Sequence, residues 1–239
     1  MTLDGTNTWV ITDAEQGALV VDPGPAIESH LDAVLAVCRP RLVLIILTHR
    51  HLDHSEGAAM LAEWGGGSVR AADPHFRIGS DGLEAGERLT LGAITLEVLE
   101  TPGHTSDSRS LLLSGPDQAN RLITGDMVLG RGTTVITYPD GDLAAYFNSL
   151  DLLERLVTTR SVIELLPGHG PVVTDPAAWL SFYREHRHER LNQVRAALAA
   201  GDRTPGDVVV RVYADVDRSL WPAAEQSVRA QLEYLRAYE

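Results

Sequence analysis

Lysine is absent from this 239-residue chain, and cysteine occurs once, at Cys38. A single thiol excludes an internal disulfide, and every cationic side chain is an arginine, which suits planar recognition of carboxylates or phosphates. The N-terminus lacks the basic residues, apolar stretch and small-residue cleavage site that together mark a secretory signal. These absences predict a cytoplasmic protein.

Long apolar runs are also missing. The best of them, Leu42–Leu47, has the length of a strand, whereas a membrane-spanning helix needs roughly 20 residues. We therefore expect no membrane partner. The formal net charge of -13 argues against broad nucleic-acid affinity, because phosphate binding depends on clustered cations. Residues 1–175 hold 11 Arg against 24 acidic residues, whereas residues 176–239 hold 9 of each, so the acidity lies in the first three quarters.

Two hydrophobic periodicities alternate along the chain. Short apolar or β-branched runs between turn residues predict strands at Trp9–Thr12, Ala18–Val21, Leu42–Leu47, Ser68–Ala71, Leu89–Leu99, Ser110–Leu113, Leu122–Thr124 and Val162–Leu166. Helical spacing predicts helices at Ala26–Val37, Ser55–Trp64, Leu143–Leu156, Ala177–Ala200 and Ala223–Tyr238. The strands come in hairpin-like groups, which favours an α/β fold of two sheets with helices outside.

The composition changes after Pro171, where an Arg- and Glu-rich helix is predicted and then broken between Gly201 and Pro205. We interpret residues 1–175 as the main domain, which holds the candidate catalytic residues described below, and residues 176–239 as a small helical C-terminal module.

The predicted strand Leu42–Leu47 leads into the densest group of polar residues in the chain. Thr-His-Arg-His-Leu-Asp-His places His49 and His51 on alternate positions, and Asp53 and His54 lead into the next helix. Three imidazoles and a carboxylate this close together are a poor arrangement without a cation, because their desolvation has no compensation. Imidazole and carboxylate together are ligands of zinc and similar metals.

Three later segments each place a potential metal ligand directly after an apolar run and a glycine. These ligands are His104 in Thr-Pro-Gly-His, Asp126 in Ile-Thr-Gly-Asp and His169 in Leu-Pro-Gly-His. A glycine before the ligand lets the backbone pass close to a metal without a Cβ clash. Taken with the first motif, they predict one composite metal site.

The combination of His-x-His-x-Asp-His with Gly-His, Gly-Asp and Gly-His resembles the metallo-β-lactamase superfamily over about residues 5 to 175. The resemblance implies a four-layer αββα sandwich with two metal ions at one edge. By this resemblance His49, His51 and His104 would hold one ion, Asp53, His54 and His169 the other, and Asp126 would bridge both. A hydroxide between the ions would be the nucleophile, and Asp53 would orient it and accept its proton during attack.

Residues next to these ligands are candidates to support them. Thr48, Ser106 and Asp22 are such candidates, and Asp22 alternatively caps the helix that begins near Ala26. Tyr183 and His186, on the first C-terminal helix, either border the substrate cleft or pack in the core.

Further motifs resemble the β-lactamase-like protein 2 group, which is also similar to glyoxalase II and to fungal polyketide thioesterases. They are Gly5-Thr6-Asn7-Thr8, Leu129 to Thr134, Tyr146 to Leu150, and His186-Arg187 with Arg190. The group carries a C-terminal winged-helix-like module. Its members usually have more residues before the Gly-Thr-Asn-Thr motif, so the sequence leaves open whether Met1 is the true start.

The substrate stays open at this point. The first hypothesis is hydrolysis of a small acyl compound, a thioester or lactone, which the acidity favours. The second is a single-strand endoribonuclease, with a phosphate track along one helix formed by Arg184, Arg187, Arg190 and Arg195. The third is a metal-binding protein without catalysis. We expect two Zn²⁺, although Mn²⁺ or Fe suits the same ligands. The sequence does not determine the oligomeric state.

Overall fold

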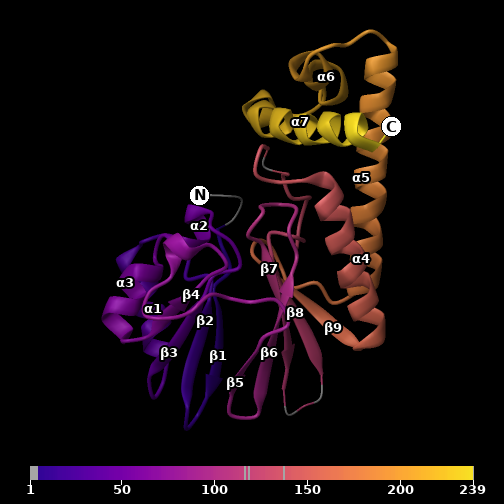
Figure 1. Ribbon diagram of the computed structural model, residues 1–239. Helices are drawn as coiled ribbons and strands as arrows, with labels where there is room; N and C mark the ends of the chain where they lie inside the picture. The colour runs from indigo at the N-terminus through magenta and orange to yellow at the C-terminus, as the bar shows by residue number, and fades with distance from the viewer. Residues whose placement is uncertain (1–4, 116, 118, 137, 239) are drawn as a thin grey trace.

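The computed structural model describes residues 5–115, 117, 119–136 and 138–238, so the question of whether Met1 is the true start lies outside it. Two β-sheets pack face to face, with helices on both outer faces and a small helical lobe at one end (Figure 1). The predicted αββα sandwich with a C-terminal module is confirmed.

The first sheet has the order β1-β2-β3-β4, in which β1 and β2 are antiparallel and the other neighbours parallel. Its strands are β1 (Trp9–Asp13), β2 (Gly17–Val21), β3 (Leu42–Ile46) and β4 (Ser68–Arg70). The second sheet is antiparallel except for its last pair. Its strands are β5 (Arg88–Leu91), β6 (Ile94–Glu100), β7 (Arg109–Ser114), β8 (Asn120–Gly125) and β9 (Val162–Pro167).

The helices lie between strands of the first sheet, between β8 and β9, and after β9. They are α1 (Glu28–Val37), α2 (Leu52–Ser55), α3 (Ala58–Gly65), α4 (Leu143–Thr159), α5 (Pro176–Ala199), α6 (Pro205–Val212) and α7 (Trp221–Tyr238), with 3-10 turns at η1 (Pro74–Phe76) and η2 (Arg218–Leu220). Among the described residues, none of these helices has both the length and the apolar character to cross a membrane.

Alternation along each strand produces the layers. In β3, Leu44 and Ile46 point into the core between the sheets, while Ile45 points toward the outer helices α1 and α3. The core between the sheets also takes Val98 from β6 and Ile123 from β8. A third core lies between the second sheet, α4, α5 and the C-terminal lobe.

Helices α4 and α5 are the elements that connect the sandwich to the lobe. The Asp142 side chain caps α4 by accepting from the Ala145 amide at 2.6 Å, and α4 buries Tyr146, Leu150 and Leu153 at helical spacing. Helix α5 is 24 residues long, so it continues past the second sheet and reaches α6 and α7 (Figure 1).

Three sequence-based expectations about the elements are wrong. The predicted strand Leu89–Leu99 is a hairpin of β5 and β6, which turns at Gly92 with a φ of 57°. Helix α6 was not expected, because we interpreted Gly201 to Pro205 only as a break, whereas Thr204 forms a capping box that starts a helix there. The alternate spacing of His49 and His51 suggested that the strand continues to them, whereas β3 ends at Ile46 and both histidines lie in the following loop.

Candidate metal centre

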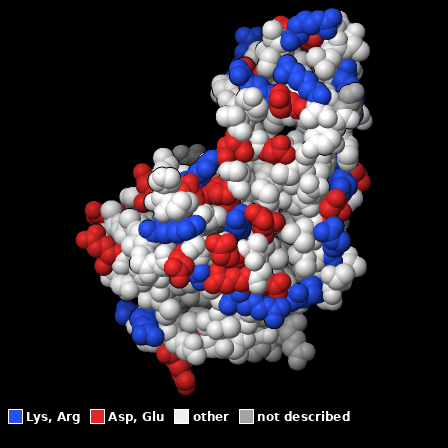
Figure 2. Space-filling model, in the orientation of Figure 1, with Lys and Arg blue, Asp and Glu red and all other residues white. Residues whose placement is uncertain are grey.

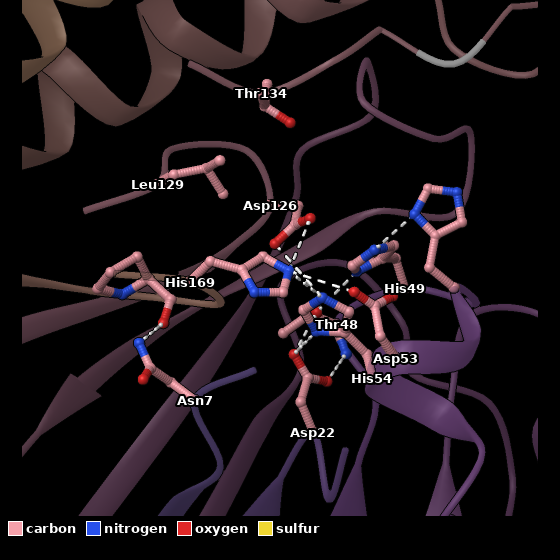
Figure 3. A network of polar contacts seen from close by, with 12 residues as sticks. Asn7, Asp22, Thr48, His49, Asp53, His54, Asp126, Leu129, Thr134 and His169 are labelled. Carbon is pink, nitrogen blue, oxygen red and sulfur yellow. Dashed lines mark hydrogen bonds and ion pairs between the residues drawn. The ribbon is translucent and has the colours of Figure 1, made fainter. Parts of the chain in front are cut away.

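The loops that follow β3, β6, β8 and β9 meet at one edge of the sandwich and bring the seven predicted ligands together. Figure 3 shows most of them in one cluster, with Asp126 facing the ring of His169 and Asp22 beneath His54. The seven residues are His49, His51, Asp53, His54, His104, Asp126 and His169.

Three imidazoles form the first half of the cluster. His51 Nδ1 lies 3.1 Å from His49 Nε2 and 3.0 Å from His104 Nε2. His49 and His104 are buried, while His51 is partly exposed. These three residues offer one nitrogen each within 4.8 Å of one another, so they could hold a metal ion.

The second half combines carboxylates with imidazoles. His169 Nε2 lies 3.2 Å from His54 Nε2 and 3.4 Å from Asp53 Oδ2. Asp126 reaches both halves: its Oδ1 is 3.4 Å from His54 Nε2, and its Oδ2 is 3.4 Å from His169 Nε2 and 3.7 Å from His104 Nε2. Its Oδ1 is buried without a hydrogen-bond partner among the described residues.

Contacts on the outer side of the rings fix which nitrogen carries the proton. His169 Nδ1 lies 2.9 Å from the Gly5 carbonyl and His104 Nδ1 2.6 Å from the Val135 carbonyl. Because a carbonyl oxygen only accepts, both Nδ1 atoms are donors. His54 Nδ1 donates in the same way to Asp22 Oδ2 at 2.9 Å.

His49 follows the same rule through a hydroxyl. The Thr48 Oγ1 hydroxyl gives its proton to Asp22 Oδ2 at 2.6 Å, so its lone pair accepts from His49 Nδ1 at 3.0 Å. In their neutral forms, His49, His54, His104 and His169 thus direct bare Nε2 lone pairs into the cluster. Two such lone pairs 3.2 Å apart, as in His54 and His169, repel unless a cation or a proton lies between them. The ligand set therefore fits metal ions.

The pKa values differ between the two halves of the cluster: they are lowered for His49 and His104 and raised for His169. Burial lowers the pKa of His104 to about 4 and that of His49 well below its usual range, so these rings are neutral at pH 7. Burial also opposes charge on His169, but hydrogen bonds with Asp126 and Asp53 outweigh it and raise its pKa to about 10. The pKa of Asp126 is held well below its usual range, because its His54 and His169 contacts outweigh burial. In the metal-free protein, a proton on His169 therefore supplies the positive charge that a metal ion would supply next to Asp126 and Asp53.

The glycines before the ligands are required, but for different reasons. A Cβ on Gly168 would lie 2.5 Å from Asp126 Oδ1 and 2.7 Å from His54 Cε1, so the expected approach to the metal ligands is present there. A Cβ on Gly103 would instead lie 2.4 Å from the Tyr146 Cα, so this glycine is needed for packing on α4.

The predicted supporting residues divide into two groups. Asp22 and Thr48 contact ligand histidines as described, and Asp22 does so as a fully buried side chain. Ser106 is exposed and donates to Asp140 at 2.6 Å, so its predicted support of a ligand is wrong. Tyr183 is fully buried, which excludes it from the border of a cleft, and His186 is partly buried.

Sequence reasoning missed the backbone acceptors of the imidazoles. The carbonyls of Gly5 and Val135 have no sequence signature, since every residue carries one. Asn7 is a partial exception: it lies in the Gly-Thr-Asn-Thr motif and donates to the carbonyls of Pro167, at 3.0 Å, and Gly170, at 2.8 Å, on either side of His169.

The arginines of α5 do not form the expected phosphate track. Arg184 pairs with Asp151 and Glu154 of α4, and Arg187 is buried. Arg190 lies over the Tyr213 ring at 4.7 Å. On the face shown in Figure 2, blue and red side chains are intermixed over the body of the molecule and form no continuous basic band.

The fold and the ligand cluster agree with a comparison of the whole chain with known families. Residues 1–169 match the family model described as the metallo-beta-lactamase superfamily. The chain belongs to this superfamily. Residues 204–238 match a second model, described as the beta-lactamase associated winged helix domain. As a member of the metallo-beta-lactamase superfamily, the chain is a metal-dependent hydrolase.

Relatives of the metallo-beta-lactamase superfamily resemble the chain over most of its length. A beta-lactamase-like protein 2 homolog from Caenorhabditis elegans is 31% identical, over 98% of this chain and 79% of the relative. An atrochrysone carboxyl ACP thioesterase from Aspergillus chevalieri is 30% identical, over 82% of this chain and 61% of the relative. A metallo-beta-lactamase family protein from Thermus thermophilus has the same fold, with a TM-score of 0.79 at 20% identity over 97% of this chain and 88% of that one.

Proposed function

We propose that this enzyme hydrolyses a small acyl substrate, a thioester or lactone, with two divalent metal ions bound at the edge of the sandwich. The observation that carries the proposal is the convergence of four Nε2 lone pairs around Asp126, each fixed from behind by an oxygen acceptor. The relative named a thioesterase supports the acyl class of substrate.

In this proposal the two halves of the cluster hold one ion each. His49, His51 and His104 would hold the first ion and Asp53, His54 and His169 the second, and Asp126 would serve both because its carboxylate contacts both halves. Nitrogen and oxygen donors of this kind suit Zn²⁺, and Mn²⁺ or Fe would accept the same set.

Two ions bound here supply Lewis-acid activation of water at neutral pH. Asp53 is the carboxylate of the site that is partly exposed, whereas Asp126 is buried. Asp53 could therefore meet an incoming substrate and accept a proton from the attacking water. Asp126 contacts His54, His104 and His169 and thereby fixes the position of one half of the cluster relative to the other.

The surroundings of the site favour an uncharged reacting group over a nucleic-acid backbone. A cavity of about 340 Å³ lies beside the ligand loops, and its arginine Arg50 contacts both Asp140 and Asp73. Its other arginine, Arg109, contacts Glu100 at 3.5 Å. With these arginines already paired, we do not extend the proposal to RNA.

A substrate panel with bound-metal analysis tests the proposal. Zinc-loaded protein should cleave acyl-thioesters or lactones and leave labelled single-stranded RNA intact. Asp126→Ala should lose this activity and hold fewer than two ions, while the matched surface variant Asp117→Asn, on the exposed β7–β8 turn, should keep both. Full activity of Asp126→Ala would refute the proposal, and two tightly bound ions without turnover on any acyl substrate would favour a binding protein.

A further inference from the structure

Arg187, in the middle of α5, occupies an unusual position for a charged side chain. It is 3% exposed, and within the described part of the chain its guanidinium forms no ion pair. It donates one hydrogen bond, to the Thr134 carbonyl, and lies 4.8 Å over the Tyr146 ring, while its Nε is buried without a partner. A buried cation so poorly compensated contributes little to folding stability.

Both groups that Arg187 contacts lie against one predicted metal ligand. The Thr134 hydroxyl is 3.1 Å from His104 Nδ1, and the next residue, Val135, provides the carbonyl that accepts from the same nitrogen. Tyr146 packs against the backbone of Gly103, directly before His104. Arg187 thus contacts Thr134, which lies beside His104 Nδ1, and Tyr146, which packs against the residue before His104.

The segment that carries Thr134 has further connections to the same two helices. The Tyr183 hydroxyl accepts from the Leu129 amide at 2.7 Å, and the Tyr146 hydroxyl donates to the Met127 carbonyl at 2.7 Å. Figure 3 shows Leu129 and Thr134 on the opposite side of Asp126 from Asp22. Helices α4 and α5 therefore hold the loop on one side of the metal centre, and Asp22 supports the other side.

We propose that Arg187 is a positioning residue for the ion held by His49, His51 and His104. It fixes the Thr134–Val135 backbone, which in turn fixes the orientation and tautomer of His104. The inference rests on the proposed two-ion site and adds a specific claim: a residue of the helix that leads to the C-terminal lobe controls one ion and not the other.

Zinc-binding measurements on Arg187→Met test this claim, with Arg184→Met as the matched control. Arg184 lies one turn earlier on α5 and binds α4 through Asp151 and Glu154, whereas Arg187 binds the Thr134 carbonyl. Competition with a chromophoric chelator gives both stepwise Zn²⁺ constants. Since loss of a hydrogen-bonding partner behind a ligand typically weakens metal binding about 10- to 100-fold, Arg187→Met should weaken one step by that factor and leave the other unchanged. Arg184→Met should leave both unchanged.

Two further readouts separate positioning from packing. In zinc-loaded protein labelled with ¹⁵N-histidine, the His104 Nδ1–H signal should shift and exchange faster in Arg187→Met, while those of His54 and His169 stay in place. Thr134→Val, which removes only the hydroxyl beside His104, should weaken Zn²⁺ binding in the same step by a smaller factor. Arg187→Lys should bind Zn²⁺ in that step more tightly than Arg187→Met and less tightly than the wild type. These two variants also test the claim if Arg187→Met does not fold.

Wild-type Zn²⁺ constants with an unchanged His104 signal in Arg187→Met would overturn the inference. Equal weakening of both ions in Arg187→Met and Arg184→Met would also overturn it, because α5 would then act only through packing. If the wild-type protein itself binds fewer than two ions, the proposed function fails instead.

Discussion

Replacing Asp22 by asparagine should remove one metal ion from the centre by changing a tautomer. The Asp22 carboxylate accepts from the Thr48 amide at 2.8 Å, from the Thr48 hydroxyl at 2.6 Å and from His54 Nδ1 at 2.9 Å. An asparagine keeps one oxygen for the Thr48 amide but turns an NH₂ donor toward His54. To pair with it, His54 must leave Nδ1 bare and place its proton on Nε2, the atom that faces Asp126 and His169.

The expected loss is about 10- to 100-fold in affinity for the ion at Asp53, His54 and His169, which is roughly 1.4–2.7 kcal/mol. Backbone strain does not contribute, because Asp22 has a φ of 52° and asparagine accepts this left-handed conformation as readily as aspartate. Thr48→Val is a comparison variant: it leaves the Asp22–His54 contact, so its effect on this ion should be smaller, and because it removes the acceptor of His49 Nδ1 it should weaken the ion at His49, His51 and His104 instead.

Chelator competition and elemental analysis of dialysed protein measure the effect. Asp22→Asn should retain close to one tightly bound zinc in place of two, with a far-UV circular dichroism spectrum like that of the wild type. If Asp22→Asn holds two ions with wild-type constants, the tautomer argument is wrong.

Three other predictions follow from the packing around the site. Gly168→Ala forces a Cβ to 2.5 Å from Asp126 Oδ1, so the free energy of unfolding in urea should fall by about 1–3 kcal/mol and bound zinc should decrease; an unchanged unfolding midpoint would contradict this. Tyr183→Phe leaves the buried Leu129 amide without its acceptor and should cost about 1–3 kcal/mol in the same assay. Burial, with Arg187 and Arg190 nearby, lowers the pKa of His186 to about 4, so the unfolded state binds more protons and metal-free protein should lose stability as the pH falls from about 6.5 to 4. His186→Gln should lose less stability over that interval, and parallel pH curves for the two proteins would rule out this contribution.

The sequence predicted which side chains converge at one edge of the sandwich, because imidazoles and carboxylates can be recognised from residue type alone. Three strand ends with a glycine and a candidate ligand, together with the motif around His49, indicate this set without coordinates, and its role as a ligand set stays a prediction. The same reasoning failed where geometry depends on the backbone: the carbonyls of Gly5 and Val135 orient His169 and His104, yet no residue type marks them. The tautomers, and hence the case for a cation, needed those contacts.

The arginines show a second limit of sequence reasoning. A helix with Arg184, Arg187 and Arg190 at spacings of three can present them to solvent or pack them against a neighbour, and periodicity alone does not distinguish these cases. Acidic partners on α4, 30 and 33 residues earlier in the chain, decide the matter for Arg184. The domain boundary at residue 176 stays a prediction, because α5 packs on α4 of the sandwich as well as on α6 and α7. The cytoplasmic location also stays a prediction.

The bond between His169 and the Gly5 carbonyl joins residues 164 positions apart, and Asn7 closes the same junction from the N-terminal side. During translation, the beginning of the chain must therefore wait for the end of β9 to leave the ribosome before the second half of the centre can form. In the proposed metal site, a nascent chain would offer a metal ion only the histidines that precede β9, so loading could be completed only late in biosynthesis. A truncation that stops short of His169 would release a polypeptide that competes for metal without being able to use it.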